Sequence, residues 1–403
     1  MSNLKLNYRT VRYIALNLLL GAFVVFYVVD GLYKLSHETI RLGPIVKGGF
    51  QLLVLLFALL TLNRAKLNII VGIFFLGLSF VIGQYYLGKN LPLHDLSVNT
   101  NTFFKYIFHF VLFLLAIDIL KYKKIPDKLF IFYKTIIIIN SLLVFVGFVL
   151  KIRDLQTYNS IYRFGYDGLI YAQNEASFVF IFALTTVYYR RFYIKIKEWF
   201  FWIVLFSTLL VATKAVFLYF ALLLLFHIFT RVPLKKILIF GASMSVMGYA
   251  IFSSTINKVF LNSWAVFMYV YNKYGLLHAL LSGRNTFISK RLFPLFTDIW
   301  VFPNYIFGGQ NRTTHLIEMG FFDLFLFFGL FGAFIYLYLL ALLIKRIEFP
   351  AYLKYFFITA LLIIVATAGH FFESAIAGVH FIFLILISKY SKDLLITNTT
   401  EIV

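Results

Sequence analysis

The residues best able to do chemistry in this sequence lie at and just inside one apolar stretch near the C-terminal third. His315 and Glu318 are three residues apart at the expected start of a helix, which places them on one face. An imidazole and a carboxylate could together supply a general base. The alternative is a carboxylate stabilising the helix N-terminus beside an interfacial histidine. Asp323 lies deeper and is expected to face away from His315, where it would orient a basic partner or react.

Cationic residues in separate segments could bind an anion beside this pair. Ser282 is expected to cap a short helix with Arg284 in its first turn, and free N–H groups with a guanidinium suit a phosphate. Lys214 stands between two apolar stretches, and Arg163 is flanked by aromatic residues suited to stacking on sugar rings. The supporting candidates are Arg153, Arg291 and His370. The alternative reading of these cations is solvated loop charge and a lysine that snorkels.

The composition indicates a membrane protein that lacks a soluble domain. The 403 residues are 62% hydrophobic, 20% aromatic and 13% charged, with a mean hydropathy of +0.90. Soluble domains carry about 25% charged residues, so this chain is too apolar to be one. Its apolar runs have the length of membrane-spanning helices and lack the alternation of barrel strands. Cysteine is absent, which excludes disulfides and thiol chemistry.

The hydropathy pattern predicts an all-α polytopic fold in a single membrane domain, residues 1–403, with the first span retained. Twelve spans are expected: 11–29, 45–62, 67–87, 102–120, 129–150, 172–189, 199–212, 214–230, 237–253, 317–344, 355–371 and 373–388. The spans 199–212 and 214–230 could instead be one long broken helix. With both termini cytoplasmic, 22 of the 37 lysines and arginines fall inside, as the positive-inside rule requires.

The remaining basic residues concentrate in two extracytoplasmic loops, 151–171 and 254–316. The second loop is expected to contain short helices, and it carries Lys258, Lys273, Arg284, Lys290, Arg291 and Arg312. This cationic loop favours an anionic ligand at the outer face of the membrane. The net charge of +21 follows the membrane topology and does not indicate nucleic acid. The sequence shows no metal-ligand spacing and no nucleotide-binding loop, so no metal and no cofactor is expected.

Taken together, these segments resemble the bacterial O-antigen polymerase and O-antigen ligase superfamily, most closely the Wzy-type polysaccharide polymerases. The resemblance spans most of 150–388. It is carried by Tyr162-Arg163-Phe164-Gly165, Ala212-Thr213-Lys214-Ala215, Ser282-Gly283-Arg284, Glu318 to Asp323 followed by Gly329-Leu330-Phe331-Gly332, and Gly369-His370. Each motif is short, and their order, spacing and sidedness are the specific part.

The resemblance implies a metal-independent glycosyltransferase of the GT-C type in the bacterial cytoplasmic membrane, with its active site on the extracytoplasmic side. Its donor and acceptor would be polyprenyl diphosphate-linked oligosaccharides, with a chain-length regulator and a flippase as further partners. Arg284, Arg163 and Lys214 would bind the diphosphate, and His315 or Glu318 would deprotonate the acceptor. The ligase branch usually shows a histidine followed by asparagine, whereas Leu316 follows His315 here, and this departure favours a polymerase.

Two alternatives to the polymerase share parts of this pattern. A ligase would transfer the finished glycan to a lipid acceptor, with the same fold and the same diphosphate site. A flippase would move the lipid-linked oligosaccharide across the membrane. A flippase would place its cations inside the helix bundle and keep its outer loops short, so the long loop 254–316 argues against it.

Overall fold

The computed structural model describes residues 7–40, 42–88, 92–121, 127–158, 164–196, 198–231, 264–265 and 267–400. Side chains after Lys392, and that of Leu277, lie outside this description. Within these ranges the protein is built from helices, and its one β contact is an isolated bridge between Gln156 and Tyr166. The predicted all-α fold is therefore confirmed.

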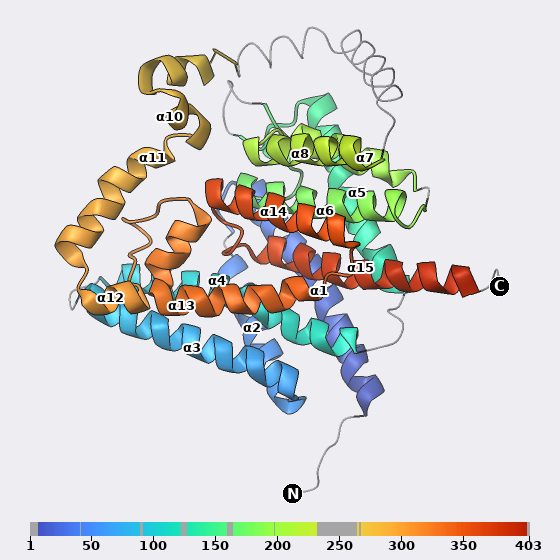
Figure 1. Ribbon diagram of the computed structural model, residues 1–403, viewed down its shortest axis with the longest axis horizontal. Coiled ribbons are helices and arrows are strands. Elements are labelled where there is room, and N and C mark those ends of the chain that lie inside the picture. The colour runs from blue at the N-terminus through green and yellow to red at the C-terminus, as the bar shows by residue number, and fades with distance from the viewer. Residues whose placement is uncertain are drawn as a thin grey trace, which may run out of the picture.

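The longer helices follow the predicted spans (Figure 1). They are α1 (Tyr8–Leu35), α2 (Gly43–Leu60), α3 (Arg64–Leu87), α4 (Leu93–Leu120), α5 (Asp127–Leu150), α6 (Gln173–Phe192), α7 (Phe200–Val211), α8 (Lys214–Arg231), α13 (Gly320–Lys345), α14 (Ala351–Thr367) and α15 (Ala375–Thr400). The expected span 237–253 lies outside the described residues.

Eight described helices are long and apolar enough to cross a membrane: α1, α2, α3, α4, α5, α8, α13 and α15. The helices α7 and α14 are apolar but shorter. The protein is thus a polytopic membrane protein by length and composition. Twelve crossings and a GT-C-like architecture remain predictions.

Short helical segments occupy the described part of the loop 254–316, as the sequence predicts. They are α10 (Leu276–Leu281), α11 (Arg284–Phe287), η2 (Ile288–Leu292), η3 (Leu295–Ile299) and α12 (Phe302–Phe307). A further short turn, η1 (Arg153–Leu155), follows α5. Figure 1 shows α10 and α11 forming an arm that leads down to α12 beside α3 and α13.

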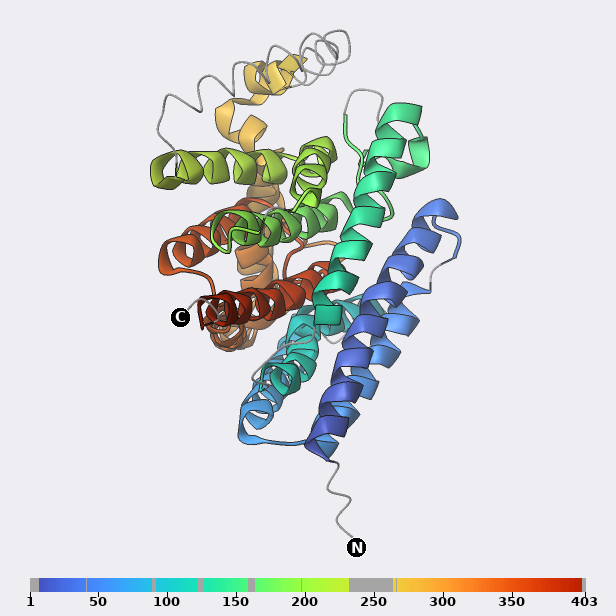
Figure 2. The ribbon, with the colours of Figure 1, turned by 90° about the vertical axis from the view of Figure 1, so that its right-hand side faces the viewer.

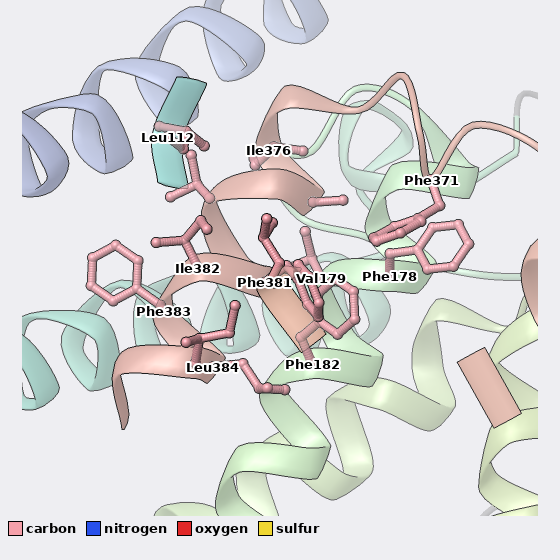
Figure 3. Close-up of a cluster of buried hydrophobic side chains, with 14 of the residues drawn as sticks. Leu112, Phe178, Val179, Phe182, Phe371, Ile376, Phe381, Ile382, Phe383 and Leu384 are labelled. Atoms are coloured by element: carbon pink, nitrogen blue, oxygen red, sulfur yellow. The ribbon is translucent and has the colours of Figure 1, made fainter. Parts of the chain in front are cut away.

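The core of the bundle lies where α15 packs between α4 and α6. Because α15 is surrounded, its apolar residues bury in every direction rather than on one face. Ile376, Phe381 and Leu384 on this helix are fully buried, and Figure 3 shows them among Phe178 and Phe182 of α6. Figure 2 shows α1, in dark blue, running alongside α5 at the edge of the bundle. This packed centre fixes the ends of the helices that carry the polar residues.

The helices α7 and α8 are two elements separated by a sharp turn. Ala212 takes a left-handed φ of 55°, which ends α7. The Thr213 hydroxyl then accepts the Val216 N–H at 3.3 Å and caps the start of α8. Residues 200–231 thus form two helices with a break at Ala212 and Thr213, and Lys214 lies at the first residue of α8.

A break in α13 is filled by the chain that follows α12. Gly329 has φ 66° and ψ −171°, so the carbonyls around it lack helical partners. The Ser79 hydroxyl donates to Phe328 O at 2.8 Å, and the Gly309 N–H donates to Leu326 O at 3.0 Å. A Cβ on Gly329 would lie 2.4 Å from the backbone of Gly308, so both positions require glycine. Irregular backbone is tolerated here because protein, not lipid, surrounds it.

Polar contacts gather at one end of the bundle, where α1, α5 and α14 finish and α6, α13 and α15 begin. We call this the site end. Lys34 near the end of α1 donates to Gly168 O at 2.9 Å, just before α6. The Gly369 N–H after α14 donates to Glu318 O at 2.9 Å, just before α13. The predicted site residues that the structure describes lie at this end.

Candidate functional site

Glu318 lies in the chain that leads into α13 rather than in the helix itself. The sequence predicts His315 and Glu318 on one helical face, but α13 begins at Gly320, and that prediction is wrong. Glu318 has a left-handed φ of 64°, and its carboxylate accepts a hydrogen bond from Arg284 Nη2 at 3.2 Å. A Cβ at Gly369 would lie 2.8 Å from the Glu318 backbone, so only glycine allows this approach.

Asp323 explains why the helix starts late. Its two carboxylate oxygens accept the N–H groups of Ile317, at 2.9 Å, and Met319, at 3.0 Å. The side chain thus holds the preceding segment in a turn that is not helical. Gln310 connects this carboxylate, at 3.2 Å, to His315 O at 2.7 Å. Asp323 is buried and faces protein, as predicted, and its role is to shape the segment that carries Glu318.

Arg284 occupies the first turn of α11, as predicted, and joins two other elements. Besides its bond to Glu318, its Nη1 donates to Thr367 O at 3.4 Å, at the end of α14. The predicted cap is different, because Ser282 adopts a left-handed φ at the end of α10 and Gly283 stands at the N-cap. Arg284 therefore anchors the arm of the loop against the start of α13.

Lys214 supports the same arm from α8. Its ammonium donates to Ala279 O at 2.7 Å and to Ser282 Oγ at 2.8 Å, both at the C-terminal end of α10. A cation there satisfies a terminal carbonyl and complements the negative end of the helix. Lys214 thus contacts Ser282, which precedes Arg284 by two residues in the chain. A contact between Lys214 and a diphosphate stays a prediction.

Replacing Lys214 by methionine should loosen the arm without changing the side-chain length greatly. Two charge-assisted hydrogen bonds would be lost, which costs roughly 1.5–3 kcal/mol before solvent screening. We expect the amides of α10 to exchange with deuterium about ten times faster in K214M. The control is Lys345→Met, a loss of charge at an exposed position on α13. Unchanged exchange in α10 would show that the arm is held by other contacts.

Arg312 forms an enclosed ion pair at the site end. Its Nη2 donates to the Glu373 carboxylate, and its Nη1 lies 3.9 Å from Asp323 Oδ1. Its backbone N–H donates to Asn99 Oδ1 at 2.9 Å. The Arg312 and Glu373 side chains are only 10% and 8% exposed, so each depends on the other for its charge to be buried.

His315 and Arg291 brace the segment before α13 rather than completing a pair with Glu318. The His315 ring contacts the Thr314 hydroxyl at 2.9 Å. Burial, with the nearby Arg291, lowers the pKa of His315. The Arg291 guanidinium donates to Leu316 O and lies 4.1 Å from the centre of the Phe287 ring. The structure therefore assigns both residues a supporting position.

His370 shares a cavity with Glu318. Both line a cavity of about 680 Å³ at the site end, which also receives Lys34 and Arg153. Burial lowers the pKa of His370, and Glu373 opposes this shift. The imidazole thus tends to stay neutral and able to accept a proton or a hydrogen bond. The cavity has the size of a small-molecule site.

Two further predicted cations have different outcomes. Arg153 lines the cavity from η1, consistent with its supporting role. Arg163 lies outside the described residues. Lys34, which also lines the cavity, pairs with the buried Asp167 and donates to Ile170 O at 3.2 Å. Burial raises the pKa of Asp167 to about 7, and Lys34 opposes this shift. This pair ties the loop 151–171 to α1.

Lys34 and Asp167 are not among the residues that the sequence predicts for the site, and Arg312 is predicted only as one of several loop cations. Glu373 lies three residues after His370 in the sequence, where nothing indicates its partner Arg312. The available signal was the polar run Gln310-Asn311-Arg312-Thr313-Thr314-His315, placed directly before an apolar stretch. A run of that kind at a membrane boundary indicates buried polar contacts.

No protein-family model, no curated protein and no solved structure matches the chain.

Proposed function

We propose that this protein is a polymerase that joins polyprenyl diphosphate-linked oligosaccharides into a surface polysaccharide. The observation that carries the proposal is the cavity of about 680 Å³ at the site end, with Glu318 and His370 in its wall. Arg284 reaches Glu318 from a loop that the sequence predicts to be extracytoplasmic. The sequence motifs Ser282-Gly283-Arg284 and Gly369-His370 both contact Glu318, through the Arg284 side chain and the Gly369 N–H. Arg284 also donates to Thr367 O, which is 83 residues away in the chain.

Glu318 and His370 in the cavity wall, with Arg284 bonded to Glu318, suit the transfer of a glycosyl unit to a sugar hydroxyl. The acceptor oxygen attacks the anomeric carbon of the donor, and the bond from that carbon to the diphosphate oxygen breaks. Glu318, with His370 beside it, takes the proton from the acceptor hydroxyl. Arg284 and Lys214, with Arg163 from the loop 151–171, stabilise the negative charge on the departing diphosphate. The donor is already activated, so no nucleotide is required.

The experiment that tests this proposal compares surface polysaccharide and lipid-linked intermediates in strains with and without the protein. We expect loss of the long ladder and accumulation of single repeat units in the strain that lacks it. Full-length polymer retained on the polyprenyl lipid would instead show a ligase. Repeat units held in the cytoplasmic leaflet would show a flippase. Purified protein in vesicles should then lengthen repeat units added as the sole substrate.

A further inference from the structure

A second polar cavity adjoins the one that contains Glu318. It has a volume of about 350 Å³ and lies between α1, α2 and α4. Tyr171 and Glu175 line both cavities, so the two meet at these side chains. A third cavity, of about 530 Å³, lies between α2 and α4 and shares Gly48 and Asn101 with the second. The three cavities share wall residues in turn, from the cavity at Glu318 to a groove between two helices.

The groove is formed by two helical stripes with small residues at their centre. On α2, Pro44, Gly48 and Leu52 are spaced four residues apart and lie on one face. On α4 the groove is lined by Leu93, Leu96, Ser97, Thr100, Asn101 and Phe104. Leu52 is 59% exposed and Leu93 is 85% exposed, although both are large and apolar. Because α2 is apolar and only its inner face is buried, this groove opens on the side of the bundle that would face lipid.

The polar cavity beside the groove contains Lys105 and Lys47, and Lys105 acts electrostatically on Glu175 in the same cavity. Lys105 is exposed, and it forms no hydrogen bond or ion pair within the part of the chain that the structure describes. Lys47 also lines this cavity and pairs with Asp30 at 2.7 Å. Acidic and amide groups face the same space, namely Glu175, Glu373, Gln51 and Asn101. Of these, Glu373 is already paired with Arg312.

We propose that the groove between α2 and α4 holds the hydrocarbon chain of a lipid-linked glycan, with its phosphate at Lys105 and Lys47. This inference rests on the proposed function and adds a second lipid site to the cavity at Glu318. The groove supplies apolar surface, and the adjoining cavity supplies the ammonium of Lys105 together with that of Lys47, which is shared with Asp30; this combination suits a phosphate at the end of an apolar chain. Neighbouring carboxylate and amide groups can accept hydrogen bonds from sugar hydroxyls. These acceptors therefore suit a phosphate that carries a glycan better than a phosphate that carries no sugar.

The arrangement also fits what a polymerase must do. Both of its substrates carry hydrocarbon chains that remain in the membrane, so each reactive end needs a lateral route to the reaction centre. The series of cavities provides one such route, because the headgroup cavity meets the Glu318 cavity at Tyr171 and Glu175. A glycan extending from Lys105 past Glu175 would arrive beside Glu318.

Two adjacent glycines offer a matched test. A Cβ added at Gly48 or at Gly49 meets no atom within 4 Å, so both positions accept a larger side chain. Gly48 lines the groove, and Gly49 lines none of the three cavities. The purified full-length protein is placed in vesicles of phosphatidylethanolamine and phosphatidylglycerol that contain a diazirine-labelled polyprenyl phosphate. We expect Gly48→Phe to reduce cross-linking at least tenfold and Gly49→Phe to leave it unchanged.

A charge change gives a second measurement that does not depend on filling the groove. Lys105→Gln should weaken cross-linking about tenfold, because a charge-assisted hydrogen bond to the phosphate is lost. The control is Lys345→Gln, which removes the same charge from an exposed position on α13. The sites of cross-linking, located by peptide mass, should include Leu52 and Leu96. Both variants are compared at equal yield of monodisperse protein.

The outcomes separate this inference from the proposed function. Equal labelling of Gly48→Phe, Gly49→Phe and the unaltered protein would overturn the groove assignment, even if polymer is made. So would labelling by a diazirine phosphatidylglycerol that is as strong as labelling by the polyprenyl phosphate, because the groove would then hold bulk lipid. Selective labelling by the polyprenyl phosphate in a protein that makes no polymer would retain the lipid site and reject the polymerase.

Discussion

Arg284→Ala is expected to lower the rate of polymer formation by at least 100-fold while the protein remains inserted in the membrane. Removing one preorganised donor from a developing negative charge costs a factor of about 10² to 10³ in rate. Arg284 also loses its bonds to Glu318 and Thr367, so the carboxylate would no longer be held at the cavity. The measurement is the length distribution of polysaccharide made by the variant in a strain that lacks the protein.

Two companion variants make this result specific. Arg284→Lys keeps the charge but cannot bridge Glu318 and Thr367 with one planar group, and it should also be impaired. Arg346→Ala removes an exposed arginine after α13 and should leave chain lengths normal. Normal polymer in Arg284→Ala would reject the leaving-group role. Glu318→Gln then asks about the base, because polymer should vanish if the carboxylate takes the proton and persist if it only positions Arg284.

Arg312→Met is expected to destabilise the protein by about 3–5 kcal/mol, whatever the protein does chemically. Removing one partner of a buried ion pair leaves the other charge without compensation. Here two carboxylates, Glu373 and Asp323, would face each other in a site that is nearly closed to solvent. The measurement is thermal or denaturant unfolding of the purified protein in detergent.

The order of the related variants identifies the cause. Glu373→Gln should cost less than Arg312→Met, since the remaining arginine still has Asp323 at 3.9 Å. The double variant should cost less than the sum of the two, because the paired charges are lost together. An Arg312→Met variant as stable as Arg346→Ala would mean that water reaches this ion pair and screens it.

The helices could be predicted because each one appears in the sequence as an uninterrupted apolar run between polar ends. The tertiary contacts of the site were not. Arg312 and Glu373 are 61 residues apart in the chain, and neither shows its partner in its local sequence. The partners of Lys214 belong to α10, 65 and 68 residues away. Positive charge in a loop therefore indicated an anion site, while the structure shows much of that charge engaged by carbonyls and carboxylates of the protein.

The pairing of His315 with Glu318 failed for a physical reason that local periodicity does not reveal. The sequence predicts that the helix already includes His315 and Glu318, just before the apolar run, whereas α13 begins at Gly320. The Asp323 carboxylate, in the first turn of α13, accepts the N–H groups of Ile317 and Met319 and holds this segment in a conformation that is not helical. His370, which follows a different helix, lies in the same cavity as Glu318, and His37 also lines that cavity. His370 and Glu318 are brought together by the backbone bond from Gly369 to Glu318.

The chain from Gly309 to Leu326 is closed at its base by the hydrogen bond between those two residues. Arg312, His315 and Glu318 all lie inside this closed ring, and Asp323 braces it from within. The number of residues in this closed segment therefore determines where each of these side chains lies. A single residue inserted after Asn311 would displace Glu318 from the cavity even though every side chain were kept. The number of residues in this segment is thus as much a part of the site as their identities.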